Sequence, residues 1–507
     1  MELKPERELD PKSVCMEHTR VETIKALMLW ISECDNGVLW CSGLAGTGKS
    51  SLVGTLHKLL CLDMSSRSRL AAFIRYDRTS YRDSSGLVTS IAYSLAKFDH
   101  RIANAIAHAL TASPAAAKLP AADQFRLLVQ GPLKKIQELQ DEGPLIVIID
   151  GLDESLNLSE ELLEVLAEGF GRELSFMRLI ISSRPEEKIA RVFKNSRHLH
   201  RYPLDTSSEE VKHDIRHFIQ QKLVKITDKH FWGDHSEQQV FAQLAERASG
   251  LFIWAATVCL FLCNHPSNER LEMILKTTIP ANATVALTSL YQTALDAIVS
   301  EGSGEDEDVR QCIHAVLGAL IVRKGNMTVP MLPKLVLQKG EGAFLAQSIV
   351  DKLGSVVRED EDGNLELIHK SFDDFLRDHG RSRDRWFIDV KKHEQELASR
   401  CVLSLTSFFE DWTSTRVQLE PVLSDINVKE TIQDRYRRVV PSHIRDYAVN
   451  VLDWHLDTFV ELGINTCGPL FNRYFLFWLE IMLVFDSLLP WDKVIPVVNV
   501  SCSRFIS

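Results

Sequence analysis

GLAGTGKS, residues 43–50, matches the pattern G-x-x-x-x-G-K-[ST] of a phosphate-binding loop. It lies between an apolar run at 38–42, which is typical of a buried strand, and a helical pattern at 50–60. In such an arrangement the glycines let backbone N–H groups surround phosphates, and the helix N-terminus adds a favourable dipole. An ordinary glycine-rich turn is the alternative, but such a turn has no use for Lys49 and Ser50.

The loop predicts a nucleotide and a metal ion. Lys49 would reach the β- and γ-phosphates, and Ser50 would be a ligand of Mg²⁺. We therefore expect ATP or ADP, or GTP or GDP, together with Mg²⁺, because the pattern does not distinguish adenine from guanine. The residues expected to bind the nucleotide are Gly43, Gly46, Thr47, Gly48, Lys49, Ser50 and Ser51.

A carboxylate at the end of a second strand should hold the hydration shell of that Mg²⁺. Asp150 follows the apolar run LIVII at 145–149 and is the expected metal ligand. Asp153 and Glu154 come soon after it, beyond the carboxyl edge of the sheet, where ligands of open α/β sheets bind. Either could orient the attacking water as a catalytic residue; the alternative is that both acids begin a solvated loop.

A cation is expected at the same edge of the sheet. The apolar run at 179–183 ends in Arg184 and Pro185, so Arg184 could bind the γ-phosphate of the nucleotide. The alternative is a surface arginine before a proline that starts a helix, which needs no functional reason.

Apolar runs alternate with helical patterns through residues 21–205. The runs are continuous, as expected of central parallel strands that helices cover on both faces. We therefore expect a lead segment at 1–20 and an α/β P-loop NTPase domain at 21–205, with a parallel sheet and helices on both faces. The expected strands are 38–42, 70–76, 145–149, 179–183 and 198–203.

The remainder of the chain is expected to be mostly helical. Apolar residues recur at helical spacing from 207 to 300, which predicts a helical domain at 206–300. The acidic stretch EGSGEDED at 301–308 is expected to be a loop, because acidic runs are usually solvated, and metal binding is the alternative.

Two short β-type runs, at 355–359 and 365–369, follow helical patterns and are joined by a turn. Helices followed by such a hairpin predict a winged-helix domain at 301–380. Residues 381–507 show only helical patterns and no period of about 20–50 residues. We expect a C-terminal α-helical region there, with the sensor repeats either absent or truncated.

Composition excludes several kinds of partner. The net charge of −11 argues against nucleic acid and against an anionic membrane surface. The ten cysteines show no zinc-ligand spacing and are expected to be reduced thiols. The apolar runs 251–263 and 475–485 are shorter than the ~20 residues of a membrane-spanning helix. With no apolar signal segment at the start, we expect a cytoplasmic protein that binds neither nucleic acid nor membrane.

The segments GLAGTGKSS, LIVIIDGLDE and LIISSRPE together resemble the NACHT family of STAND nucleotide switches. In that family a small residue follows the first Asp of the second motif, and an acidic pair comes shortly after it. The resemblance is closest to fungal, basidiomycete-like NACHT proteins of the NOD-like receptor type. In these proteins a Cys-to-Thr-Arg element precedes the domain, as at 15–20 here, and the resemblance covers about 15–376.

This resemblance implies a signalling switch that binds ADP and ATP, or GTP, and hydrolyses the triphosphate slowly. ADP would close the nucleotide domain onto the winged helix, and exchange for the triphosphate would release that contact. Self-association through the NACHT domain, and binding of protein partners of unknown identity, would follow. By the same resemblance the switch would serve fungal self/non-self recognition or programmed cell death.

The segment LIHKSFDDFL at 367–376 resembles the family's His-x-Ser-Phe motif. In relatives that histidine contacts the β-phosphate of ADP, so His369 is expected to bind the nucleotide in the closed state. Without the resemblance, a histidine before an aromatic helix is more often structural. The sequence departs from the family at His18, where a glycine is usual, and it has no Gly-x-Pro motif in the helical region.

The alternative from another class is an enzyme, a P-loop kinase or motor ATPase that turns over nucleotide on a substrate. The helical and winged-helix segments favour the switch, because a small-molecule kinase has no need of them or of His369.

Overall fold

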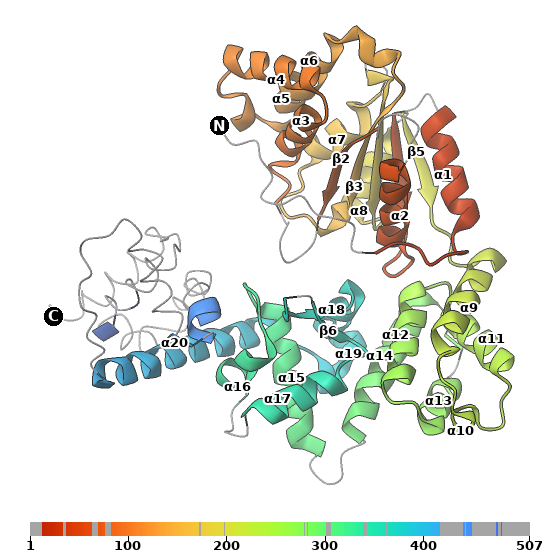
Figure 1. The fold of residues 1–507 in the computed structure, drawn as a ribbon, viewed down its shortest axis with the longest axis vertical. Helices are drawn as coiled ribbons and strands as arrows, with labels where there is room; N and C mark the ends of the chain where they lie inside the picture. The colour runs from red at the N-terminus through yellow and green to blue at the C-terminus, as the bar shows by residue number, and fades with distance from the viewer. Residues whose placement is uncertain are drawn as a thin grey trace. The chain divides into compact units, whose positions relative to one another are not determined.

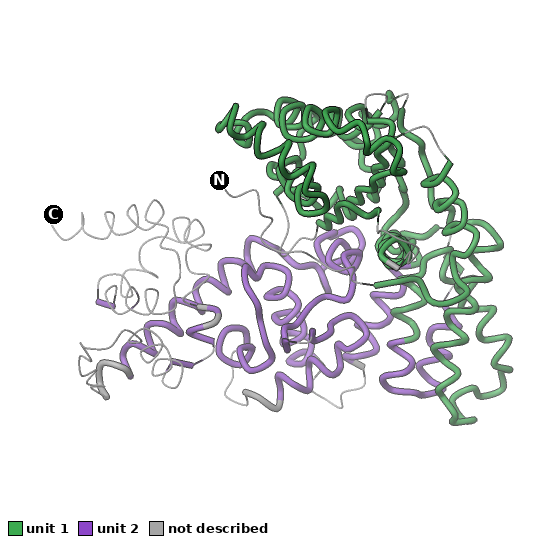
Figure 2. The backbone as a smooth tube through the Cα atoms, turned by 45° about the horizontal axis from the view of Figure 1, so that its top comes forward, with its two compact units in different colours: residues 1–259, 278–286 green, residues 260–277, 287–507 purple. Residues whose placement is uncertain are grey.

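The computed structural model describes most of the chain between residues 13 and 415 and a few residues beyond it. These residues form two compact units, 1–259 with 278–286 and 260–277 with 287–507 (Figure 2). The described residues are 13–33, 37–62, 69–76, 83–171, 174–196, 198–277, 279–280, 282–300, 306–337, 342–360, 362–415, 440–441, 443–448, 473–474 and 478.

Unit 1 contains a five-stranded parallel sheet in the order β2-β3-β4-β1-β5 (Figure 1). The parallel sheet predicted from the apolar runs is confirmed, and each strand lies within two residues of its predicted ends. The strands are β1 (Val38–Ser42), β2 (Leu70–Arg75), β3 (Leu145–Asp150), β4 (Met177–Ser183) and β5 (Leu199–Pro203).

Alternate strand residues point to opposite sides of the sheet. Both sides carry buried apolar side chains, and helices cover both faces. Leu39 and Cys41 of β1 pack with α1 (Val21–Glu33) and α2 (Lys49–Leu62), whereas Val38 and Trp40 join the core of the other face. That second face is covered by α3 (Leu87–Phe98), α4 (His100–Ala112), α5 (Ala121–Phe125), the π-helical turn Arg126–Gln130, α6 (Gly131–Lys134), α7 (Glu160–Glu168) and α8 (Glu187–Asn195). Three short 3-10 turns lie at Ala116–Lys118, Gln137–Gln140 and Leu152–Glu154.

The helical patterns after residue 206 form helices, and serine side chains begin three of them. Ser208, Ser236 and Ser267 each accept a hydrogen bond from a backbone N–H in the first turn, which satisfies a donor that the helix leaves unpaired. The helices are α9 (Glu209–Leu223), α10 (Lys229–Trp232), α11 (Glu237–Arg247), α12 (Phe252–Asn264), α13 (Asn268–Leu275) and α14 (Ala283–Ser300).

The apolar run at 251–263 forms α12, most of whose side chains are buried. Among the described residues, no helix has the length and apolar character needed to cross a membrane. The second apolar run, 475–485, lies outside the described residues apart from Trp478.

Unit 2 continues with α15 (Asp306–Val322), a 3-10 turn (Val329–Met331), α16 (Leu332–Leu335) and α17 (Gly342–Lys352). The expectation of a loop over 301–308 is wrong for its last three residues, because α15 begins at Asp306. Acidic residues are favourable in the first turn of a helix, where they face the positive end of its dipole. This effect explains the earlier start.

The expected hairpin is present as β6 (Val357–Glu359) and β7 (Leu365–Leu367), which pair antiparallel. Asp360 closes the turn by accepting hydrogen bonds from the backbone N–H groups of Asp362 and Asn364. The winged-helix assignment stays a prediction.

Helices α18 (Lys370–Arg377), α19 (His379–Trp386) and α20 (Val390–Thr415) follow the hairpin. A π-helical turn at His443–Ala448 is the last element described. The rest of the expected C-terminal helical region lies outside the described residues.

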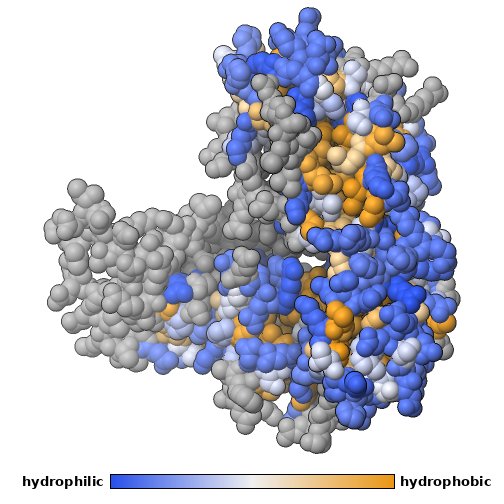
Figure 3. Space-filling view, turned by 45° about the vertical axis from the view of Figure 1, so that its right-hand side comes forward, coloured by the Kyte–Doolittle hydropathy of each residue, from blue (hydrophilic) through white to orange (hydrophobic). Residues whose placement is uncertain are grey.

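On the face drawn in Figure 3, hydrophilic residues cover much of the surface, and apolar residues gather in a patch on the sheet-containing part. Leu29 of α1 and Leu59 of α2 are among the exposed apolar side chains of unit 1, at 55% and 40%.

Candidate phosphate-binding site

The loop 43–50 connects β1 to α2 and has a backbone that requires glycine at two positions. Gly46 and Gly48 have φ angles of +80° and +88°, in the left-handed region that other residues rarely adopt. The loop is tied to the sheet, because the Gly43 N–H donates to the carbonyl of Ser183 in β4 at 3.3 Å. The buried side chain of Thr47 closes it internally by donating to the Leu44 carbonyl at 3.0 Å.

Gly46 has a second reason to be glycine, which the sequence did not reveal. A Cβ atom at this position would lie 1.9 Å from Cγ2 of Ile253, in the first turn of α12. The Ile253 N–H donates to the Gly46 carbonyl at 3.1 Å. The loop is therefore in direct contact with α12, and Gly46 permits that contact.

Lys49 begins α2, and its ammonium group lies against the loop. Its Nζ donates to the carbonyls of Gly43 at 2.8 Å and Leu44 at 2.9 Å. Burial lowers the pKa of Lys49, and the nearby carboxylate of Asp153 opposes that shift. The cation is thus partly desolvated, which strengthens its attraction for an anion.

Asp150 ends β3 and is 3% exposed. Ser50 donates from Oγ to its Oδ1 at 3.3 Å, so the two predicted metal ligands lie together. Burial raises the pKa of Asp150, while the hydroxyls of Ser182 and Ser50 and the charge of Lys49 lower it in part. A buried carboxylate whose desolvation is only partly compensated in this way is suited to a cation.

Ser182 of β4 is a site residue that sequence reasoning missed. Its Oγ donates a short hydrogen bond to Oδ1 of Asp150 and accepts from the Gly151 N–H at 3.2 Å. It therefore holds the carboxylate and the turn after it. The available signal was the pair of serines, Ser182 and Ser183, at the end of the apolar run that begins at Leu179.

The side-chain oxygens of Ser50 and Asp150 fit Mg²⁺ rather than a metal held by protein ligands alone. Within the described part of the chain, no three His, Cys, Asp or Glu side chains gather to hold a metal ion. Mg²⁺ usually takes one or two carboxylates, with phosphate and water oxygens completing its shell. Ser50 and Asp150 would hold the ion, which stabilises negative charge on the phosphates when bound.

Asp153 and Arg184 bind each other at the same edge of the sheet. Asp153 Oδ1 accepts from the Arg184 backbone N–H at 2.9 Å, and its Oδ2 lies 3.4 Å from Arg184 Nε. The Asp153 side chain is 2% exposed. Gly151, at φ +73°, turns the chain so that Asp153 and Glu154 follow in a 3-10 turn. The geometry favours Asp153 as the group that orients Arg184. Glu154 is half-buried, and the catalytic role expected of Asp153 or Glu154 stays a prediction.

His369 lies in unit 2, immediately before α18. Its Nδ1 accepts a hydrogen bond from the Ser371 N–H at 3.0 Å and lies 2.7 Å from Ser371 Oγ, which is 2.7 Å from the hydroxyl of Tyr291 in α14. An Nδ1 that accepts from a backbone N–H carries no proton, so the neutral imidazole has its proton on Nε2. His369 is therefore both the N-cap of α18 and a potential Nε2–H donor.

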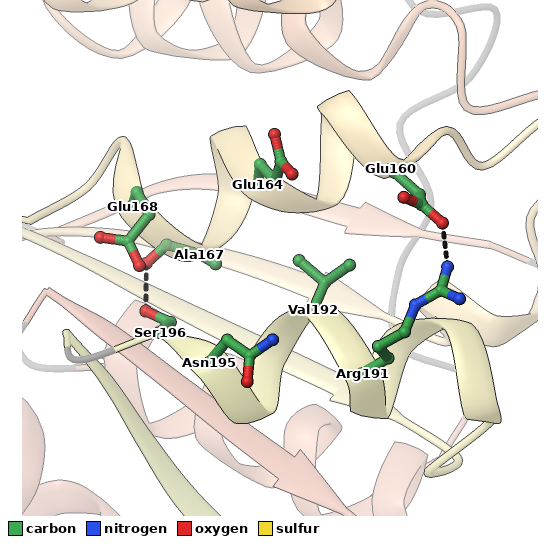
Figure 4. A pocket seen from close by; sticks show the side chains of 8 residues that line it. All are labelled: Glu160, Glu164, Ala167, Glu168, Arg191, Val192, Asn195 and Ser196. Carbon is green, nitrogen blue, oxygen red and sulfur yellow. Dashed lines mark hydrogen bonds and ion pairs between the residues drawn. The ribbon is translucent and has the colours of Figure 1, made fainter.

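A separate pocket of about 270 Å³ lies between α7 and α8 (Figure 4). Glu160, Glu164 and Glu168 line it from α7, and Arg191 of α8 forms an ion pair with Glu160. Three carboxylates repel phosphate, so this pocket does not fit a nucleotide.

The strand order, the glycine-rich loop and the Ser50–Asp150 pair together define a P-loop ATPase-like fold with a candidate phosphate-binding site. Residues 22–184 match the family model described as "Nephrocystin 3, N-terminal", and this match contains the loop, Asp150 and Arg184. No curated protein matches the chain.

Solved structures similar to the chain include Walker-type ATPases. The Walker-type ATPase of Pyrococcus abyssi is 13% identical with a TM-score of 0.36, covering 73% of this chain and 99% of that one. Cdc6p from Pyrobaculum aerophilum is 12% identical with a TM-score of 0.30, covering 78% and 96%. The ORC2 protein of Aeropyrum pernix, in ADPNP–ADP complexes, is 13% identical with a TM-score of 0.28, covering 78% and 96%.

Proposed function

We propose that this protein is a nucleotide-dependent signalling switch of the NACHT/STAND type. It binds ADP in a closed state and ATP or GTP with Mg²⁺ in an open state, and it hydrolyses the triphosphate slowly. The open state self-associates through the nucleotide domain and binds protein partners in the cytoplasm. The resemblance to fungal NACHT proteins supports a role of this switch in self/non-self recognition or programmed cell death.

The observation that carries the proposal is the pairing of Ser50 with the buried Asp150 beside the glycine-rich loop. A loop that only connected a strand to a helix would not need a buried carboxylate whose pKa is raised by burial. Such a carboxylate costs stability unless a cation neutralises it, so its presence supports a metal–nucleotide site.

The other site residues have separate roles in this proposal. The backbone N–H groups of the loop and Lys49 bind the phosphates, and Ser51 lies in the same first turn of α2. Glu154 orients the attacking water, and Asp153 holds Arg184 so that its guanidinium can bind the γ-phosphate. Hydrolysis ends the triphosphate-bound state.

His369 supplies the contact that distinguishes the closed state. Its cap on α18 fixes the proton on Nε2, and an Nε2–H donor can bind an ADP phosphate oxygen. A contact made in one state alone shifts the equilibrium toward that state.

The proposal is tested by the nucleotide that the purified protein retains and by its rate of turnover. Denatured wild-type protein should release ADP near one equivalent, and single-turnover hydrolysis of ATP should be slow and slower still in Glu154→Gln. Glu164→Gln, in the acidic pocket of the same unit, is the matched control and should hydrolyse ATP as wild type does. Protein that retains no nucleotide and hydrolyses ATP rapidly through many cycles would instead be a turnover enzyme.

A further inference from the structure

Arg20 lies in the segment before α1 and against the phosphate loop. We propose that Arg20 is a positioning residue that couples nucleotide binding at this loop to helices α9 and α12. The inference rests on the proposed function, because it requires a nucleotide at residues 43–50. It adds to that function the route by which the bound nucleotide acts on helical elements of the same unit.

Arg20 contacts the loop and α12 through its side chain and α9 through its backbone N–H. It is 4% exposed, and its Nη2 donates to the Thr47 carbonyl at 2.9 Å. Its backbone N–H donates to the carboxylate of Asp214 in α9 at 2.8 Å. Its guanidinium lies over the ring of Phe252, the first residue of α12, 5.2 Å from the ring centroid. One buried residue thus links three separate elements, two through its guanidinium and one through its backbone N–H.

The backbone around Arg20 is held in a conformation that is unfavourable by itself. The φ angles of His18 and Arg20 are +65° and +57°, in the left-handed region that costs free energy for residues other than glycine. Upstream contacts fix this segment to α2, because the Cys15 N–H donates to Thr55 Oγ1 at 2.8 Å. Such strain persists where surrounding contacts impose it, and here these contacts include the phosphate loop.

The bond from Arg20 to Thr47 sets the direction of the next N–H group in the loop. In a trans peptide the C=O and the following N–H point in opposite directions. Because the Thr47 carbonyl points at Arg20, the Gly48 N–H points away from Arg20, and in the proposed function this N–H is one of those that bind phosphate. A charged donor at the carbonyl also polarises the peptide and makes its N–H a stronger donor.

The coupling works in both directions, as linkage requires. An anion bound by the Gly48 N–H strengthens the bond between Thr47 and Arg20, and with it the hold of Arg20 on Asp214 and Phe252. The Ile253 N–H provides a parallel link from α12 to the Gly46 carbonyl, at 3.1 Å. Nucleotide binding should therefore order α9 and the start of α12.

Amide hydrogen exchange of the full chain, with and without saturating ADP, tests this coupling. In wild type, ADP should slow exchange in residues 44–50 and also in 213–219 of α9 and 254–258 of α12, by about 10-fold. Arg20→Met should raise the Kd for ADP about 10-fold, as expected for a lost charge-assisted hydrogen bond. With ADP raised to full occupancy, this variant should keep the slowing in the loop, lose it in α9 and keep only part of it in α12, where the Ile253 link to Gly46 remains.

Two further variants sharpen the result. Arg20→Lys keeps a cation and should restore part of the slowing in both helices. Arg191→Met removes a comparably long cation that pairs with Glu160 and lies outside the loop, so it should behave as wild type does.

The inference is overturned if Arg20→Met at full ADP occupancy still slows exchange in α9 and α12 as much as wild type does. It is equally overturned if wild type shows slowing in the loop and none in either helix. That comparison needs no variant and does not depend on whether Arg20→Met folds. A wild-type protein that binds no ADP gives a different result, because it overturns the proposed function together with this inference.

Discussion

Among single residues, Ser182 and Ser183 offer a matched pair, since both are buried hydroxyls at the end of β4. Ser182 holds Asp150, whereas Ser183 Oγ accepts from the indole N–H of Trp40 at 2.8 Å, on the other side of the strand. In Ser182→Ala, the gain in ATP affinity that Mg²⁺ causes should be about 10-fold smaller than in wild type. This is the effect of losing one hydrogen bond to a charged group. Ser183→Ala should only lower the melting temperature. Isothermal titrations with ATP at several Mg²⁺ concentrations measure this, and equal losses in both variants would contradict the role of Ser182.

The burial of Asp150 predicts that its ionisation lowers the free energy of unfolding in a pH-dependent way. Its pKa is raised by burial, so the folded state favours the protonated carboxyl, and ionisation destabilises the protein as pH rises through the folded-state pKa. Asp150→Asn should therefore melt about 2–4 °C higher than wild type at pH 7 without Mg²⁺, and the difference should shrink toward pH 4. Melting curves across that range decide it. A variant less stable than wild type at pH 7 would show that Asp150 stabilises the fold by its charge.

Sequence reasoning placed correctly those residues of the candidate site whose position depends on local sequence. The loop 43–50 and Asp150 were predictable, because a strand followed by a loop or turn places them at one sheet edge. Ser182 and Arg20 were missed, because their roles arise from contacts with Asp150 and Thr47 that are distant in sequence. Asp153 was placed at the site, but its pairing with Arg184 became visible only in the structure.

At the scale of the helices, His369 has two roles to separate: it is the N-cap of α18, and it is proposed to bind a phosphate of ADP. The histidine caps this helix, so His369→Ala loses about 1 kcal/mol of cap energy in addition to any phosphate contact. Asparagine is a strong N-cap without an imidazole, so His369→Asn should retain the melting temperature of wild type. If His369 binds ADP, both variants should release a fluorescent ADP analogue roughly 10- to 100-fold faster in stopped-flow experiments. Unchanged release from both would leave His369 with a structural role only.

Helices α15 and α20 meet at two imidazoles, those of His314 and His393, with ring centroids 5.0 Å apart. Burial lowers the pKa of both below the ordinary value of 6.5, and the charge of Lys392 acts in the same direction on each. Arg310 further lowers the pKa of His314, whereas Glu396 opposes the shift at both rings.

The folded state therefore favours neutral rings at His314 and His393. A depressed pKa contributes stability that is present above the unfolded value of about 6.5 and is lost as pH falls through the folded-state value. Acidification from pH 7 to pH 5 should lower the melting temperature of wild type more than that of His393→Gln, by about 2–4 °C. His265→Gln, at an exposed position of the same unit, should retain the wild-type response. Equal acid sensitivity in wild type and His393→Gln would contradict this account.

Helices and strands were predicted correctly where a single local pattern dominated the sequence. Continuous apolar runs predicted the parallel strands, and the turn at 360–364 predicted the hairpin, because both patterns are local. The acidic stretch at 301–308 misled, since its last residues are the first turn of α15 and acidic residues suit both a loop and a helix N-terminus.

Across the whole molecule, the sequence predicted a parallel sheet covered on both faces and a mostly helical remainder, and the described residues show both. It could not predict that α12 would contact the phosphate loop through Ile253, because hydropathy gives no direction to a helix that is apolar on all sides. The division into two units, with 278–286 grouped with the sheet, also depends on packing and not on local pattern.

The central claim is that nucleotide binds at the loop through Lys49, and calorimetric titration of ADP into nucleotide-free wild type and Lys49→Ala tests it most directly. Wild type should bind one ADP per chain. Lys49→Ala, shown by its melting curve to be folded, should lose at least 100-fold in affinity, because the ammonium makes charge-assisted bonds to phosphate. Lys58→Ala, an exposed lysine later in α2, should bind as wild type does. Equal affinity of wild type and folded Lys49→Ala, or no binding by wild type, would contradict the account.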